Sequence, residues 1–503
     1  MADHRDDAPE AYRELLDQYE RLTALGGAQG VLSWDQQVMM PEGGNPARSK
    51  QLSTLSGLNH DLMTADVVAD SLDELEDADL TDEQAAVVRE IERQYVRAER
   101  VPRDLVEEIS QTSSEALQAW EEARENDDFE TFAPYLEKLV ELKREYAEHI
   151  DDERDPYAVL FEDYEPYIDL ETAERVLGRL RGELVPLIEE IQASDADLAT
   201  PFEGETFDPD AQEAFSRDVL DAVGYDWDRG RLDTSTHPFT SGNQFDTRIT
   251  TRFSEEEPLD SMMSTVHEFG HALYNLGLPR EEYGTPLGED RDLTVHESQS
   301  RLWENHVGRS QAFWERFAPT LREQFPSLAD ATARDVYEAA NQVYPDNLIR
   351  VEADELTYHM HIVLRFEIER GLISGDLDVS EVPEVWDDKM EEYLGVRPET
   401  DTEGCLQDIH WSHGNFGYFP TYSLGSVLAA QLYAHAERDI DDLDAKVAEG
   451  DFDALHEWLS ERVHRHGCRY TTPELVEEAT GEAYTADYFL DYAKSKFGEL
   501  YDL

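Results

Sequence analysis

Lysine is almost missing from this chain, and its scarcity is part of an unusual charge balance. Only seven of the 42 basic residues are lysine, and 115 aspartates and glutamates give the 503 residues a formal net charge of -73. Such a chain would repel itself in dilute solution, but at ionic strengths of about 1 M the Debye length falls to roughly 3 Å and screens the repulsion. The acids are spread from Asp3 to Asp502 and do not form a tail. The composition therefore predicts a halophilic protein.

Other absences narrow the class of protein. No basic cluster is present, which argues against nucleic acid as a partner, because phosphate contacts need gathered lysines and arginines. No apolar run reaches about eighteen residues, so no membrane span is expected, and residues 1–7 lack the apolar core of a secretory leader. The two cysteines, Cys405 and Cys468, are too few for a disulfide scaffold and lie outside any C-x-x-C motif. These absences favour a cytoplasmic location.

Hydrophobic spacing predicts a mainly α-helical chain with a small β element. The best strand pattern is 243–252, and its place just ahead of a strongly periodic helix favours an edge strand beside a cleft. Without a repeat or a flexible linker, residues 1–503 are expected to form one large domain, with room for two lobes around a groove. The ranges expected to be helical are 11–24, 82–98, 104–126, 128–149, 170–191, 209–223, 331–342, 348–369 and 421–436.

Two segments interrupt the acidic composition. Between residues 234 and 251 the only charges are Asp246 and Arg248, and between 405 and 436 the only charge apart from histidine is Asp408. Because surface segments of this chain are acidic almost everywhere else, we expect both segments to be buried or to line a site.

The segment 267–271, His-Glu-Phe-Gly-His, carries the clearest chemical signal. Residues four apart on an α-helix lie on one face, so His267 and His271 can reach one metal ion. Glu268 could lie beside the ion without binding it and accept a proton from the attacking water, as a metalloprotease requires. The alternative is a pair of surface histidines on an ordinary helix.

A catalytic zinc ion usually takes three protein ligands, so a third is needed. Glu297 lies 26 residues after His271 on an apparent second helix, and the turn-rich stretch 277–290 could join two antiparallel helices. His296 competes for the same role, and spacing does not separate the two. For Glu297 the alternative is an ordinary solvated carboxylate.

Six motifs occur in the order found in a known peptidase family. They are H-P-F at 237–239, D-x-R-x-T at 246–250, H-E-x-x-H at 267–271, H-E-S-Q at 296–299, I-R-x-x-A-D at 349–354 and G-x-x-Q-D-x-H-W at 404–411. With Leu-Ser-Trp-Asp at 32–35, they make the chain resemble the carboxypeptidase Taq family of metallocarboxypeptidases, also called thermostable carboxypeptidase 1. None of the six motifs departs from the family pattern.

The resemblance implies a mainly helical, saddle-like homodimer with a deep groove in each subunit, as in angiotensin-converting-enzyme-like and neurolysin-like peptidases. It implies removal of C-terminal residues from peptides one at a time, with broad specificity and resistance at proline. It also implies one zinc ion per subunit, which cobalt can replace. The implied ligands are His267, His271 and Glu297, and the implied general base is Glu268.

The remaining candidates follow from what an exopeptidase needs. A guanidinium can bind the free carboxylate of the substrate through two hydrogen bonds, and Arg350 is the first candidate and Arg248 the second. A structural ion pair is the alternative for each. His410 could donate a hydrogen bond to the oxyanion, and His237 could do the same or hold a substrate carbonyl. A structural histidine is the alternative for both.

Five further residues are expected around the site. Tyr418 and Tyr422 could line the groove and bind substrate, although packing is the more common role of such aromatics. Asp246, Gln407 and Asp408 are expected to orient the ligands or the arginines. The favoured function is a zinc-dependent carboxypeptidase. The alternatives are an endo-acting oligopeptidase with the same metal centre and a non-catalytic metal- or peptide-binding protein, against which the presence of Glu268 argues.

Overall fold

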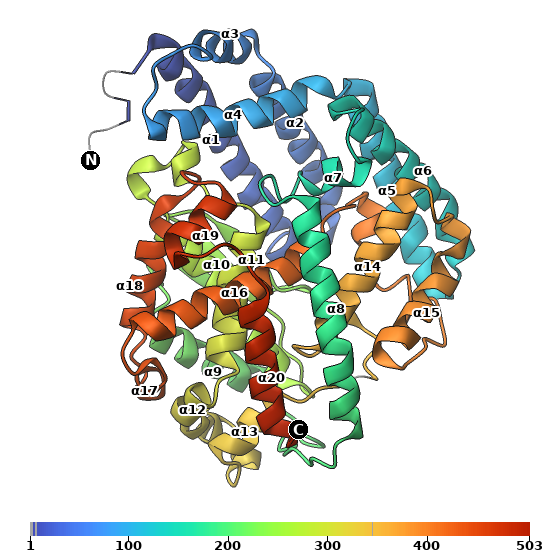
Figure 1. Ribbon diagram of the computed structural model, residues 1–503, viewed down its shortest axis with the longest axis vertical. Coiled ribbons are helices and arrows are strands. Elements are labelled where there is room, and N and C mark those ends of the chain that lie inside the picture. The colour runs from blue at the N-terminus through green and yellow to red at the C-terminus, as the bar shows by residue number, and fades with distance from the viewer. Residues whose placement is uncertain (1–3, 6–7, 345) are drawn as a thin grey trace.

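The computed structural model describes residues 4–5, 8–344 and 346–503. Helices make up most of this part of the chain, and a small three-stranded sheet accompanies them (Figure 1). The predicted mainly α class with a small β element is therefore confirmed. Within the described residues, no helix combines the length and apolar character needed to cross a bilayer. Residues 1–3 and 6–7 of the segment that we expect to lack a leader lie outside the described part.

The N-terminal helices form one end of the molecule and have a small core of their own (Figure 1). This core gathers Tyr12, Leu15 and Leu16 with Val87 and Ile91. The helix expected at 11–24 is correct but continues much further, to Val38. The helices of this end are α1 (Glu10–Val38), α2 (Asn45–Met63), α3 (Asp66–Leu75) and α4 (Asp82–Arg100).

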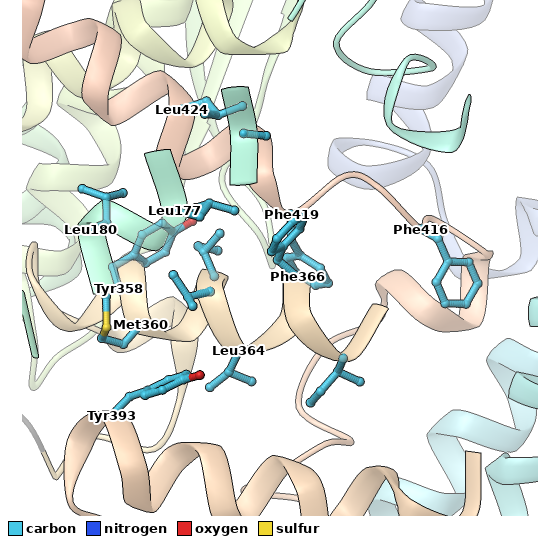
Figure 2. Close-up of a cluster of buried hydrophobic side chains, with 14 of the residues drawn as sticks. Leu177, Leu180, Tyr358, Met360, Leu364, Phe366, Tyr393, Phe416, Phe419 and Leu424 are labelled. Carbon is cyan, nitrogen blue, oxygen red and sulfur yellow. The ribbon is translucent and has the colours of Figure 1, made fainter. Parts of the chain in front are cut away.

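A second and larger core joins helices from the middle and the end of the chain. Figure 2 shows part of it, where Leu177 and Leu180 lie near Tyr358, Met360 and Leu364. The helices that contribute are α5 (Arg103–Asn126), α6 (Phe129–Ile150), α7 (Pro156–Phe161), α8 (Leu170–Ala193), α14 (Thr357–Ser374), α15 (Val382–Leu394) and α20 (Asp487–Tyr501).

The third core surrounds the helix that carries residues 267–271. Val266, Phe269 and Trp303 lie at its centre and are fully buried. The helices that contribute are α9 (Pro209–Val223), α10 (Pro258–Gly277), α11 (Leu293–Arg301), α12 (Gln311–Gln324), α13 (Ala333–Ala340), α17 (Leu443–Glu449), α18 (Asp453–Arg462) and α19 (Thr472–Thr480).

Helix α16 (Pro420–Asp439) connects the second and third cores. Leu424 and Val427 belong to one core, while Leu428 and Leu432 belong to the other. A helix that is apolar around its whole circumference is stable only when it is covered on every side. The expectation that residues 405–436 are buried or line a site is therefore confirmed for this helix.

The sheet lies against α10 and corrects one expectation. Its strands are β1 (Gly230–Thr234), β2 (Thr240–Gly242) and β3 (Thr247–Thr251), in the order β1-β3-β2. β1 pairs with β3 in parallel and β2 pairs with β3 antiparallel, so β3 is the central strand. The expected edge position of 243–252 is wrong because β2, which is too short and polar to show a pattern, covers that side. Within 234–251, burial is continuous only from Ile249.

The helix expected at 348–369 begins later than predicted. Residues Arg350–Glu352 form a short 3-10 turn, and α14 starts at Thr357. The carboxylate of Asp354 accepts hydrogen bonds from the backbone N–H groups of Leu356 and Thr357, which satisfies donors at a helix start. This local capping separates Arg350 from α14 and leaves it in a connecting segment.

Candidate metal and catalytic site

The structure brings His267, His271 and Glu297 together. One ligand atom from each lies within 4.8 Å of the others. The carboxylate Oε2 of Glu297 is 3.7 Å from Nε2 of His267 and 3.4 Å from Nε2 of His271. Ligand atoms placed tetrahedrally about 2.0–2.1 Å from zinc would be roughly 3.3 Å apart. Two imidazole nitrogens and one carboxylate oxygen at this spacing fit a zinc ion and leave a fourth position free.

Close helix crossings hold these three residues in place. Helix α11 passes so near to α10 that a Cβ on Gly270 would lie 2.5 Å from the backbone oxygen of Gln299. On its other face, α11 meets α16 at Gly425, where a Cβ would lie 2.5 Å from Cβ and Cγ of Glu297. Both glycines are therefore required by the approach of neighbouring chain, and Gly425 fixes the side chain of Glu297.

Replacing Gly425 with alanine should lower the affinity for a divalent metal ion by about 10- to 100-fold, the range found when residues that orient metal ligands are changed. The added methyl group would displace the Glu297 side chain. Competition with a chelator measures the affinity. Gly182→Ala on α8 is the matched control, since nothing lies within 4 Å of its Cβ. Unchanged affinity in Gly425→Ala would contradict this role.

His296 lies behind His271 and does not join the ligand set. Its Nδ1 is 2.6 Å from Nδ1 of His271, and its Nε2 is 3.2 Å from Oδ1 of Asn275. A single assignment satisfies both contacts: His271 donates from Nδ1 to His296, and His296 donates from Nε2 to Asn275. Burial lowers the pKa of His296 to about 4, so that it stays neutral and can accept this bond. The arrangement directs Nε2 of His271 towards Glu297.

His267 is oriented by a residue that the sequence did not reveal. Its Nδ1 donates to Oε2 of Glu304 at 2.9 Å. Burial alone would raise the pKa of Glu304, but Arg301 in particular holds it well below its usual range. Arg301 binds both Glu304 at 3.1 Å and the second oxygen of Glu297 at 2.7 Å. This network fixes both a histidine and a carboxylate of the ligand set.

Glu304 reaches His267 because the chain changes its helical form after α11. Residues Leu302–Gly308 form a π-helix, which is rare and often found at functional sites. Arg309, directly after it, binds the other oxygen of Glu304 at 3.1 Å. Nothing in the hydrophobic spacing predicts this turn, although Glu304 and Arg301 are three residues apart as an ion pair on a helix would be.

Glu268 lies beside the ligand set and is buried. The hydroxyl of Thr240, on edge strand β2, donates to its Oε2 at 2.6 Å. Burial raises the pKa of Glu268 to about 7. A carboxyl group with this pKa can take up and return a proton near neutrality, which suits a general base.

Arg350 and Asp408 form a buried ion pair, and Arg365 shares the same carboxylate. Nη2 of Arg350 is 2.8 Å from Oδ1 of Asp408, and Nε of Arg365 is 2.6 Å from Oδ2. Gln407 accepts a hydrogen bond from the backbone N–H of Arg350 at 2.8 Å. Two guanidinium groups share one carboxylate here, so one positive charge remains to be balanced. A buried charge of this kind favours the binding of an anion.

Aromatic side chains surround this arginine pair. Nη1 of Arg350 donates a hydrogen bond to the hydroxyl oxygen of Tyr358 at 3.3 Å. The guanidinium carbon of Arg350 is 5.4 Å from the ring centroid of Tyr422. The rings of Tyr418 and Tyr422 are in edge contact, with centroids 5.3 Å apart. The ring centroids of His410 and Tyr418 are 5.4 Å apart. Burial lowers the pKa of His410 to about 4. A neutral imidazole in this place can still donate one hydrogen bond.

The other two candidates lie elsewhere. Arg248 on β3 binds Asp246 through two hydrogen bonds of 3.0 and 2.6 Å and stacks over Trp34 at 4.3 Å. His237 is exposed in the segment between β1 and β2, where its backbone oxygen accepts from Ser235. No described contact joins either residue to the ligand set, in contrast to Arg350, which is linked to it through Tyr358 and Arg301.

The comparisons with known proteins cover nearly the whole chain. A family model described as carboxypeptidase Taq (M32) metallopeptidase matches residues 14–497. Thermostable carboxypeptidase 1 from Pyrococcus furiosus is 40% identical over 492 residues, which cover 97% of this chain and 98% of the relative. Thermostable carboxypeptidase 1 from Thermus thermophilus is 41% identical over 508 residues, which cover 98% of this chain and 99% of the relative.

Solved structures show the same fold. The crystal structure of the M32 carboxypeptidase from Deinococcus radiodurans R1 superposes with a TM-score of 0.95 at 41% identity, covering 98% of this chain and all of the other. Metallocarboxypeptidase 1 of Trypanosoma cruzi superposes with a TM-score of 0.93 at 36% identity. The superposition covers 97% of this chain and 99% of the other. The similarity therefore extends over the whole described architecture.

Proposed function

Because the chain belongs to the carboxypeptidase Taq (M32) metallopeptidase family and is a metallocarboxypeptidase, we propose that it is a zinc-dependent enzyme which removes C-terminal residues from peptides with broad specificity and resistance at proline. The observation that supports zinc most directly is the spacing of His267, His271 and Glu297. Cobalt would fit the same ligands. A bound zinc ion would polarise the scissile carbonyl and acidify the attacking water.

The protein side chains would divide the remaining work. Glu268 would take a proton from the attacking water and return it to the departing amine. Arg350 would hold the free carboxylate of the substrate, since its cluster with Arg365 and Asp408 has one positive charge to spare. His410 would donate a hydrogen bond to the oxyanion. Tyr418 and Tyr422 would line this part of the groove.

The carboxylate anchor separates this proposal from an endo-acting oligopeptidase. We expect a peptide with a free C-terminal carboxylate to be shortened residue by residue, while the same peptide with an amidated C-terminus remains intact. Mass spectrometry of the two digests distinguishes the cases. Internal cleavage of both peptides would favour the oligopeptidase.

We further propose that the protein acts in the cytoplasm of a cell rich in salt, as a homodimer with residues 1–503 forming one domain per subunit. The net charge of -73 supports the proposal of a salt-rich cytoplasm. The family resemblance supports the proposal of a homodimer.

Salt should decide whether the fold is stable. We expect the midpoint of thermal unfolding to rise steeply between dilute buffer and about 2–3 M KCl, because the Debye length shrinks to a few ångströms over that range. Circular dichroism at a series of KCl concentrations measures the midpoint. An equal concentration of osmolyte without charge is the control. A midpoint that does not change with salt would contradict the halophilic assignment.

A further inference from the structure

Strand β2 reaches the proposed general base through one side chain. The hydroxyl oxygen of Thr240 lies 2.6 Å from Oε2 of Glu268 and 2.9 Å from the main-chain oxygen of the same residue. Within the described part of the chain, no other hydrogen-bond donor contacts this carboxylate. Thr240 therefore holds Oε2 and leaves the other oxygen, Oε1, without a protein donor.

The Thr240 hydroxyl has one hydrogen to offer to these two acceptors. A charged carboxylate accepts shorter and stronger hydrogen bonds than a neutral carbonyl does. The distances agree with this preference, since Oε2 is the nearer of the two oxygens. The hydroxyl therefore serves the carboxylate first, while its contact with the main-chain oxygen keeps β2 beside the turn of α10 that carries Glu268.

Thr240 can fix the Glu268 side chain only if its own strand is fixed. Thr240 pairs with Ile249 of β3, which is fully buried. The preceding residue, Phe239, donates from its N–H to Oγ1 of Thr250 at 2.9 Å, and its carbonyl accepts from the N–H of Thr250 at 3.0 Å. Thr250 is itself fully buried. These contacts hold the Thr240 hydroxyl in a constant place relative to β3.

A second threonine makes a similar link without reaching the base. Thr251 of β3 is fully buried, and its hydroxyl donates to the main-chain oxygen of Ser261 on α10 at 3.0 Å. Both threonines thus connect the sheet to a main-chain oxygen of α10, but only Thr240 also binds the Glu268 carboxylate. Comparing the two separates an effect on catalysis from support of the fold.

We propose that Thr240 is a positioning residue for the reaction, whose hydroxyl holds Oε2 of Glu268 so that Oε1 faces the attacking water. A glutamate side chain has several rotatable bonds, and a displacement of about 1 Å in a reacting group can lower a rate by about a hundredfold. The inference rests on the proposed function, because it takes Glu268 to be the general base. It goes further by giving a strand of three residues a part in the reaction.

Replacing Thr240 with valine tests this role, because valine keeps the shape and removes the hydroxyl. We expect kcat on a free-acid peptide to fall by about 10- to 100-fold, the effect of losing a hydrogen bond to a charged group. KM and the affinity for a divalent metal ion should each change by less than about threefold. Thr240→Ser restores the hydroxyl and should restore kcat to within about threefold. Thr251→Val is the matched control and should change kcat by less than about twofold.

A double-mutant cycle shows whether the hydroxyl acts through Glu268. Adding Thr240→Val to the Glu268→Gln protein should lower the remaining kcat by less than about twofold, because the base is already absent. Thr240→Ala provides a second variant if Thr240→Val does not fold.

An undiminished loss of kcat in the Glu268→Gln background would overturn the inference. So would an effect of Thr240→Val confined to KM, a failure of serine to restore kcat, or an equal loss in Thr251→Val. These outcomes leave the general base in place. A Glu268→Gln protein with the kcat of the wild type would instead count against the proposed function.

Discussion

Replacing Glu268 with glutamine should lower kcat by about a thousandfold while leaving zinc binding intact, since general acid–base catalysis typically contributes about 10²–10⁴. Glutamine has the same size and can still accept the hydrogen bond from Thr240. It cannot take a proton from water. Steady-state kinetics on a free-acid peptide, together with the zinc content of the purified protein, measure the two properties separately.

Glu297→Gln is the matched control for this experiment. This variant also removes a carboxylate from the site, but the carboxylate is that of a proposed metal ligand. Oε2 of Glu297 lies 3.4 Å from Nε2 of His271. We expect this variant to lose zinc affinity as well as activity. If Glu268→Gln lost its zinc to the same extent as Glu297→Gln, the assignment of Glu268 as a base outside the ligand set would fail.

Replacing Arg350 with alanine should lower kcat/KM for free-acid peptides by roughly a hundredfold or more. Truncating one partner of a buried, hydrogen-bonded charge pair typically costs about 2–5 kcal/mol, and each 1.4 kcal/mol is a factor of ten. The loss should occur mainly in KM if the anchor acts in binding, and in kcat as well if it aligns the scissile bond. Kinetics over a range of peptide concentrations separates the two.

Arg248→Ala is the matched control, because Arg248 is also paired with an aspartate through two hydrogen bonds. We expect it to change kcat/KM by less than about threefold, as is usual when a partly exposed ion pair is lost. Thermal unfolding checks that Arg350→Ala retains its fold, and Arg350→Lys keeps the charge but loses the planar geometry. A reversal, with Arg248→Ala inactive and Arg350→Ala normal, would place the anchor at Arg248.

Much of the fold could be predicted from local pattern alone. The helix at 209–223 has the predicted bounds, and those at 82–98, 104–126 and 128–149 differ from the structure by one or two residues at either end. These helices are amphipathic with clear stops, so that local spacing determines them. Helices such as α12 and α15 were missed, because acidic residues or proline dilute their apolar spacing.

The parts that depend on tertiary contacts were not predictable. The role of β2 follows from its pairing with β3 and from the contact of Thr240 with Glu268, not from its three residues. The start of α14 depends on the Asp354 cap, which a periodic pattern overlooks. The π-helix that presents Glu304 to His267 has no sequence signature in hydrophobic spacing.

At the site, the motif residues were identified but their support was not. His267 and His271 follow from the helical repeat. Spacing alone left His296 and Glu297 open, the resemblance favoured Glu297, and the packing of α11 against α10 and α16 places Glu297 beside both histidines. The sequence could have suggested Asn275, since it continues the same face of α10 one turn after His271. Its contact with His296 became visible only in three dimensions.

Mass spectrometry of a peptide digest in about 2–3 M KCl, with and without a chelator, tests the central claim most directly. The account predicts a ladder of products that each lack one more C-terminal residue, a block at proline, and no products once the metal is removed, with zinc or cobalt restoring the ladder. Internal fragments, or a ladder that persists in the chelator after metal removal has been verified, would contradict it.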